Sequence, residues 1–169
     1  RGGCVAQTAI LGRDCRECCV GAGVEGVRVG RGERCFEAVS VIAGAAVLAP
    51  MATRIHDPAG GGVLNGHVEC ACASDVRIAL DPSAVPVREP TRRLCAAVGV
   101  DPLRVFGSGS LLATVPADET ESTLEALTTE DIDATAIATV ESAAGEPGVV
   151  IDGERYTDGI DDDLYALWE

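Results

Sequence analysis

The sequence predicts an α+β fold in which a mixed β-sheet is flanked by helices. Stretches with the apolar spacing of helices and stretches with the composition of strands both occur, without the regular alternation of βαβ proteins. The chain has 169 residues, of which 47% are hydrophobic, so it can build one substantial core and is too short to need two. We therefore expect a single domain over residues 1–169.

The first helices are predicted from apolar residues that recur every three or four positions. Residues 37–49 have this spacing, and a second helix follows the three glycines at 60–62. Residues 76–80 then alternate like a half-buried strand. A short helix over 90–98 is expected to end at Gly99, because glycine readily adopts the left-handed conformation found at helix C-termini.

The second half of the chain predicts strands, a helix and a hairpin. Residues 110–115 and 134–140 are apolar runs short enough for strands. Between them, the Asp-Glu-Thr-Glu run from Asp118 fits a capping box that opens a helix. Residues 149–156 indicate a hairpin with the favoured Asp-Gly turn, and the acidic run 161–163 is expected at the start of a short terminal helix.

Residues 1–35 are atypical, because they hold five of the eight cysteines and show no sustained period. Cys15 and Cys18 have the spacing of half a zinc site, but no second pair of comparable spacing follows, so we predict no metal site. The remaining cysteines are expected to act as small buried hydrophobic residues: Cys70, Cys72 and Cys95.

The charge of the chain is strongly acidic, with a net charge of -14 and no lysine among its 13 basic residues. Residues 118–169 hold 16 acidic residues and one arginine. Because phosphate backbones require a basic surface, nucleic-acid binding is not expected. No apolar run is long enough to cross a bilayer. We expect a cytoplasmic protein whose acidic surface serves solubility in a halophilic setting, the alternative being a docking surface for a basic partner.

A histidine, an aspartate and three glycines precede the second predicted helix. The first amides of a helix attract anions, and glycines allow the backbone to approach a ligand closely. The pattern is compatible either with a phosphate cradle or with a plain turn. His56 and Asp57 are candidate catalytic groups, the alternatives being structural roles for both. The predicted anion-binding residues of this stretch are Gly60, Gly61 and Gly62.

The order of motifs resembles the C-terminal domain of the AIR synthase-related superfamily. The stretch from His56 to Gly62 is similar to a family loop, and Val-Pro-Val at 85–87, the segment 95–103 and the segment 107–112 follow in the family order. The likeness is good over residues 40–140 and is strongest to the hydrogenase expression/formation HypE branch. It implies the same α+β fold, a mixed sheet flanked by helices, and it implies that a helix starts at residues 6–12.

The resemblance also implies an activity, which is ATP-dependent activation of an amide or acid oxygen by phosphorylation. In this family ATP and Mg²⁺ are held mostly by an N-terminal domain that is absent from this chain. The fragment alone is therefore expected to be inactive. A homodimer and a maturation partner protein are further expectations from the resemblance. It adds a second loop as a nucleotide or substrate contact, the alternative being a turn at the entry to a strand: Gly107, Ser108 and Gly109.

Three departures from the family pattern leave the enzyme assignment open. Ala59 and Gly60 stand where the HypE type has threonine and arginine, and Ser108 stands where it has glutamate. The C-terminal cysteine of that type is replaced by the ending Ala-Leu-Trp-Glu. Two alternatives follow. One is a purine-type AIR synthase-like ligase, favoured by the triple glycine, and the other is a non-catalytic binding or assembly module. The acceptor substrate does not follow from the sequence.

Overall fold

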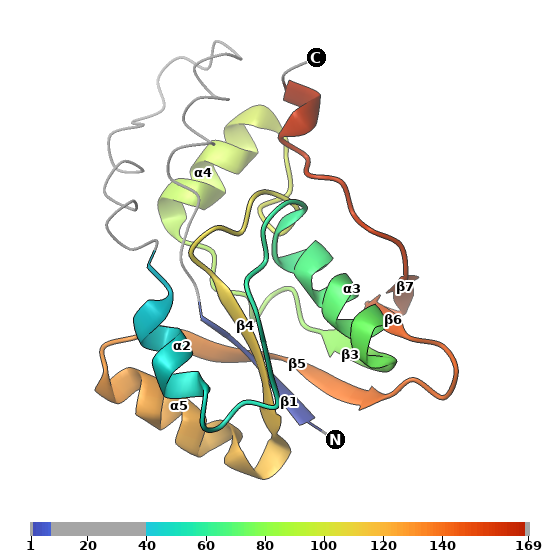
Figure 1. The fold of residues 1–169 in the computed structure, drawn as a ribbon. Coiled ribbons are helices and arrows are strands. Elements are labelled where there is room, and N and C mark those ends of the chain that lie inside the picture. Colours follow the sequence, from blue (N-terminus) through green and yellow to red (C-terminus); the bar gives the residue numbers. More distant parts are fainter. Residues whose placement is uncertain (1, 8–39, 168–169) are drawn as a thin grey trace.

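The computed structural model describes residues 2–7 and 40–167, and they form a seven-stranded mixed sheet with helices on both faces (Figure 1). The strand order is β2-β4-β1-β5-β3-β6-β7, and β3 pairs with β6 in parallel while the other pairs are antiparallel. The predicted α+β class is thereby confirmed. The strands are β1 (Gly2–Gln7), β2 (Arg54–His56), β3 (Val76–Leu80), β4 (Leu111–Pro116), β5 (Ala134–Ser142), β6 (Gly148–Ile151) and β7 (Glu154–Tyr156).

The side chains of β4 alternate between two apolar layers. Leu112 packs into the layer that contains α3, whereas Leu111, Ala113 and Val115 pack into the layer on the opposite face of the sheet. That second layer contains α2 and α5, which lie side by side in Figure 1. The helices are α2 (Ile42–Leu48), α3 (Gly62–Ser74), α4 (Glu89–Val98) and α5 (Thr120–Thr129).

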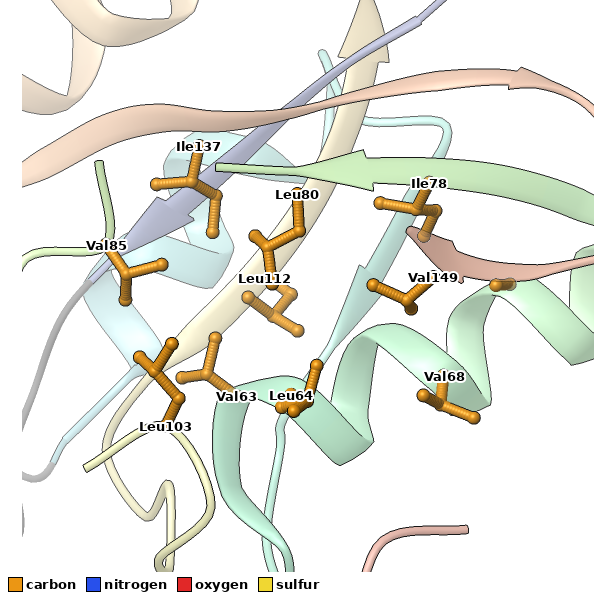
Figure 2. Packing of buried hydrophobic residues seen from close by; sticks show 11 residues of the cluster. Val63, Leu64, Val68, Ile78, Leu80, Val85, Leu103, Leu112, Ile137 and Val149 are labelled. Atoms are coloured by element: carbon orange, nitrogen blue, oxygen red, sulfur yellow. The ribbon is translucent and has the colours of Figure 1, made fainter. Parts of the chain in front are cut away.

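The main core fills the space between α3 and the sheet. Figure 2 shows Leu64 of α3 facing apolar side chains from the strands, and Val68 of the same helix belongs to this cluster. Ile78 and Val149 are at most 1% exposed and come from the parallel pair β3 and β6. Burying side chains of this size contributes about 1.5–3 kcal/mol each. This packing fixes α3 firmly. The loop that precedes α3 therefore ends at a rigid helix.

Some local predictions are wrong in detail. The capping box from Asp118 does not form, because residues 117–119 make a 3-10 turn and α5 starts at Thr120 without a side-chain cap. Ala6 and Gln7, predicted as the start of a helix, belong to β1, and the rest of that predicted helix lies outside the described residues. The terminal helix is only a 3-10 turn, Tyr165–Leu167.

The cysteine predictions are partly confirmed. Cys95 is buried, Cys70 is half-buried, and Cys72 is exposed, so the expectation that Cys72 is buried is wrong. The Cys72 thiol donates to the carbonyl of Thr157 at 3.4 Å. Cys15 and Cys18 lie outside the described residues. Within residues 2–7 and 40–167 no helix is long and apolar enough to span a membrane.

Candidate functional site at the start of helix α3

Three segments that are distant in sequence meet at the N-terminus of α3. We call them the glycine loop (residues 57–62), the second loop (residues 106–110) and the C-terminal segment (residues 160–165). Gly107 N–H donates to the carbonyl of Ala59 at 3.1 Å, which joins the first two. The structure thus brings together the two loops that the sequence singled out.

Gly61 and Gly62 are required by close backbone packing. Their φ angles are +72° and +65°, in the region where a side chain is strained. A Cβ at Gly61 would collide with the carbonyl oxygen of Ile160, and one at Gly62 would lie 2.7 Å from the carbonyl oxygen of Leu103. Gly60 differs from both, because the nearest atom to a Cβ there is the Tyr165 hydroxyl at 3.8 Å.

An internal carboxylate lies at the amide of Gly61. Gly61 N–H donates to Asp162 Oδ2 at 3.0 Å, and Leu164 N–H donates to Asp162 Oδ1 at 3.0 Å. Gly62 N–H is also used, since it donates to the carbonyl of Ala59 at 3.1 Å. Asp162 is 3% exposed. The preference of this helix N-terminus for negative charge is therefore met by the chain itself in this conformation.

His56 and Asp57, the two candidate catalytic residues, differ in their surroundings. His56 ends β2, and its Nε2 lies 2.7 Å from Glu69 Oε2 on α3. The His56 side chain is 31% exposed. Asp57 is exposed at the start of the glycine loop. The structure therefore places a histidine held by a carboxylate next to a solvent-accessible acid.

Asn65 and Glu69 were not found from the sequence, although they lie four residues apart on one side of α3. Asn65 Nδ2 donates to the Gly60 carbonyl at 3.0 Å and to Glu69 Oε1 at 3.1 Å. Ile160 N–H donates to Asn65 Oδ1 at 2.9 Å, which fastens the C-terminal segment to α3. The spacing of four residues between these two polar side chains, on a mostly apolar helix, was the available signal.

The second loop is packed at its glycines and open at its serine. A Cβ at Gly107 would lie 2.7 Å from the carbonyl oxygen of Pro58. Gly109 is buried with a φ of +88°, and Ser108 is exposed. At the start of this loop, the Phe106 ring meets the Tyr165 ring edge to face at 5.6 Å between centroids. Ser108 is thus the predicted contact of this loop whose side chain is available to a ligand.

An ATP-dependent enzyme must bind the nucleotide together with Mg²⁺, and the described residues can supply only some of the necessary contacts. They contain no cluster of three or more His, Cys, Asp or Glu side chains that could hold a metal ion. The amides of Gly61 and Gly62 are already bonded within the chain. This domain by itself does not fit a complete Mg²⁺–nucleotide complex. It offers the exposed Asp57 carboxylate and the open side of Gly60.

His67 is a buried structural group and makes the stability of the fold sensitive to pH. Desolvation lowers the pKa of His67 from 6.5 to about 4, although its bond to the Val63 carbonyl opposes that shift. Between pH 6.5 and 4 the unfolded chain takes up a proton at His67 that the folded chain does not. We expect this residue to remove about 3 kcal/mol of stability over that interval. Urea unfolding of wild type and His67→Gln across this range measures it, and parallel profiles would contradict it.

Comparison with known proteins supports the fold and the family. The carbamoyl dehydratase HypE of Azotobacter vinelandii is 44% identical over 73 residues, which are 43% of this chain and 21% of that protein. A crystal structure of Escherichia coli HypE matches with a TM-score of 0.72 and 21% identity, covering 98% of this chain and 52% of that one. A structure of HypE in complex with ATP matches with a TM-score of 0.70, 20% identity and the same coverage.

The chain spans about half of the matched HypE structures and about a fifth of the curated relative. At these identities the structural matches establish the fold alone. The family is established separately, because the model for the AIR synthase related protein, C-terminal domain, matches residues 25–151. The resemblance predicted from the motifs is confirmed, and the chain belongs to the AIR synthase-related C-terminal domain family.

Proposed function

We propose that this chain is the C-terminal domain of a HypE-like, ATP-dependent enzyme of the hydrogenase-maturation type. Such an enzyme activates an amide or acid oxygen by phosphorylation, which turns that oxygen into a good leaving group. The observation that carries the proposal is the 44% identity to a carbamoyl dehydratase HypE, together with the family match. The arrangement of His56 and Asp57 beside the glycine loop supports it.

Each site residue has a proposed part in this reaction. Asp57 is exposed and orients the substrate amide or acid. His56 is the acid/base group. Gly60 offers the open side of the glycine loop to a phosphoryl oxygen, while Gly61 and Gly62 shape that loop. From the second loop, Ser108 contacts nucleotide or substrate, and Gly107 and Gly109 set its backbone.

A separate N-terminal domain would supply the remaining groups. We assign to it most of the contacts to ATP and Mg²⁺, since the described residues lack a metal cluster of their own. When bound, ATP supplies the phosphoryl group. The 169-residue chain alone is then inactive, and the working unit is a homodimer of the two-domain protein.

The setting of the protein is proposed by the same route. A structure of HypE with HypF gives a precedent for a maturation partner that binds an enzyme of this type. The net charge of -14 fits a cytoplasmic, halophilic protein, because acidic surfaces remain hydrated and soluble in concentrated salt.

Asp57→Ala tests the catalytic proposal in the two-domain protein. We expect ATP hydrolysis stimulated by a carbamoyl or carboxylate substrate to fall by about 10²-fold, because the orienting group is lost. Phosphate release is the measurement. Asp133→Ala removes an exposed carboxylate from another part of the chain and is the control. Equal rates for wild type and Asp57→Ala would contradict the assigned role.

A non-catalytic assembly module is the second candidate. It is favoured by the internal bond from Gly61 N–H to Asp162, which occupies an amide that a phosphate would otherwise use. In that case neither the wild-type two-domain protein nor its Asp57→Ala variant would hydrolyse ATP with any candidate substrate. Stable binding to a maturation partner without nucleotide turnover would then identify the module.

A further inference from the structure

The Glu69 carboxylate joins two side chains at the candidate site. Its Oε2 lies 2.7 Å from His56 Nε2, and its Oε1 accepts a hydrogen bond from Asn65 Nδ2 at 3.1 Å. Asn65 also donates to the carbonyl of Gly60 and accepts from Ile160 N–H. The histidine is therefore tied, through one glutamate and one asparagine, to the glycine loop and the C-terminal segment.

The chemistry of these groups determines which nitrogen of His56 carries the proton. An ionised carboxylate only accepts hydrogen bonds, so His56 Nε2 must be the donor in this contact. In the neutral ring the lone pair is then on Nδ1. The same reasoning gives His67 the opposite tautomer, because its Nδ1 lies 2.7 Å from the Val63 carbonyl and must donate there.

The orientation of the ring agrees with this assignment. A Cβ built at Gly66 would lie 3.4 Å from His56 Cδ2, so the Cδ2–Nε2 edge of the ring faces α3. Nδ1 lies on the opposite edge, away from that helix. Among residues 2–7 and 40–167, no partner is recorded for Nδ1, and the side chain keeps 31% of its surface exposed. A proton acceptor on the free edge of a fixed ring is the arrangement required of a general base.

We propose that Glu69 is a positioning residue that fixes His56 with Nδ1 free to accept a proton from the substrate. The inference rests on the proposed function. With ATP bound, the amide oxygen would take its γ-phosphoryl group while the bond from that phosphorus to the ADP oxygen breaks and ADP leaves. An N–H bond of the substrate amide breaks, and the proton moves to Nδ1. The electrons of that bond form the C=N bond of the phosphorylated substrate, and the Glu69 carboxylate balances the imidazolium charge.

Long-range ¹H–¹⁵N spectra of the imidazole rings test the tautomers directly in the 169-residue chain. The chain has two histidines, so both rings can be assigned from one spectrum. The spectra are recorded at about pH 9, well above the ordinary pKa of histidine, and we expect His56 to carry its proton at Nε2 and His67 at Nδ1. A His56 ring protonated at Nδ1 would overturn the proposal.

Glu69→Gln is the decisive variant, because a carboxamide cannot accept from both neighbours. Its NH₂ group must face either His56 or Asn65, so we expect a substantial Nδ1-protonated population of His56 while the His67 pattern stays unchanged. The unchanged His67 signal also shows that the variant folds. Glu125→Gln, on the exposed side of α5, is the matched control. An unaltered His56 spectrum in Glu69→Gln would overturn the positioning role.

Kinetics of the two-domain protein separate this inference from the proposed function. We expect kcat of Glu69→Gln to fall by about 10²-fold with KM nearly unchanged, since a misplaced proton disables a base without removing binding contacts. A normal kcat would overturn the role of Glu69 in proton transfer. A third result is a wild-type protein without ATP-dependent activity whose His56 tautomer still changes in Glu69→Gln. The proposed function then fails, and Glu69 only holds the His56 ring in place.

Discussion

Gly61→Ala should lower the free energy of unfolding by about 3–5 kcal/mol. The alanine would be held in a strained left-handed backbone conformation, and its methyl group would clash with neighbouring atoms. The φ of +72° is unfavourable for alanine, and the new methyl would meet the Ile160 carbonyl oxygen. It would also lie 2.6 Å from the Asn65 Cβ. Ile160 and Asn65 are joined to each other by a hydrogen bond, so the strain cannot relax by a side-chain rotation alone.

Gly60→Ala is the matched control one residue earlier. The nearest atom to its added methyl is the Tyr165 hydroxyl at 3.8 Å, an ordinary contact. We expect a change within about 1 kcal/mol, of either sign, because alanine also reduces the freedom of the unfolded chain. Chemical denaturation of both variants measures the difference. If the two variants are equally stable, Gly61 is not packed as the structure describes.

The contrast between adjacent glycines marks the limit of the sequence prediction. Three consecutive glycines located the loop before α3, since glycine is the residue that tolerates close backbone approach. The atoms that approach, however, belong to Ile160 and Leu103, far away along the chain. Which glycine is indispensable therefore depends on tertiary packing that no local pattern contains.

The same distinction separates correct from missed elements of the fold. The hairpin of β6 and β7 was predicted because its Asp152-Gly153 turn is a local signal, and both residues have positive φ. Strand β2 was not predicted, because its three residues form a strand only by pairing with β4. In that pairing, His56 at the end of β2 lies opposite Leu112 of β4. Short edge strands are formed by their partners more than by their own composition.

For the candidate site, the sequence pointed to the two loops and to His56 and Asp57, but it did not reveal Asn65, Glu69 or the contacts that join them. His56 and Glu69 are 13 residues apart, on a strand end and on the following helix, so no helical or strand spacing connects them. Asp162 was interpreted as part of an acidic start to a terminal helix. One of its oxygens does accept from Leu164 N–H there, but the other accepts from Gly61 N–H, 101 residues away.

That second bond leads to a large expected effect for Asp162→Ala, a loss of about 3–4 kcal/mol in unfolding free energy. The buried carboxylate serves the N–H groups of Gly61 and Leu164, and alanine would leave both without this acceptor. The favourable interaction of a negative charge with the N-terminus of α3 would be lost as well. Urea denaturation at neutral pH is the measurement.

Two neighbouring substitutions show whether the loss comes from these bonds or from charge alone. Asp161→Ala removes an exposed carboxylate from the same acidic run, and we expect it to change stability by no more than about 0.5 kcal/mol. Asp162→Asn keeps one accepting oxygen and should lose about half as much as Asp162→Ala. If repulsion among the acidic side chains dominated instead, removing either carboxylate would raise the stability. A more stable Asp162→Ala would therefore mean that this carboxylate does not hold the glycine loop.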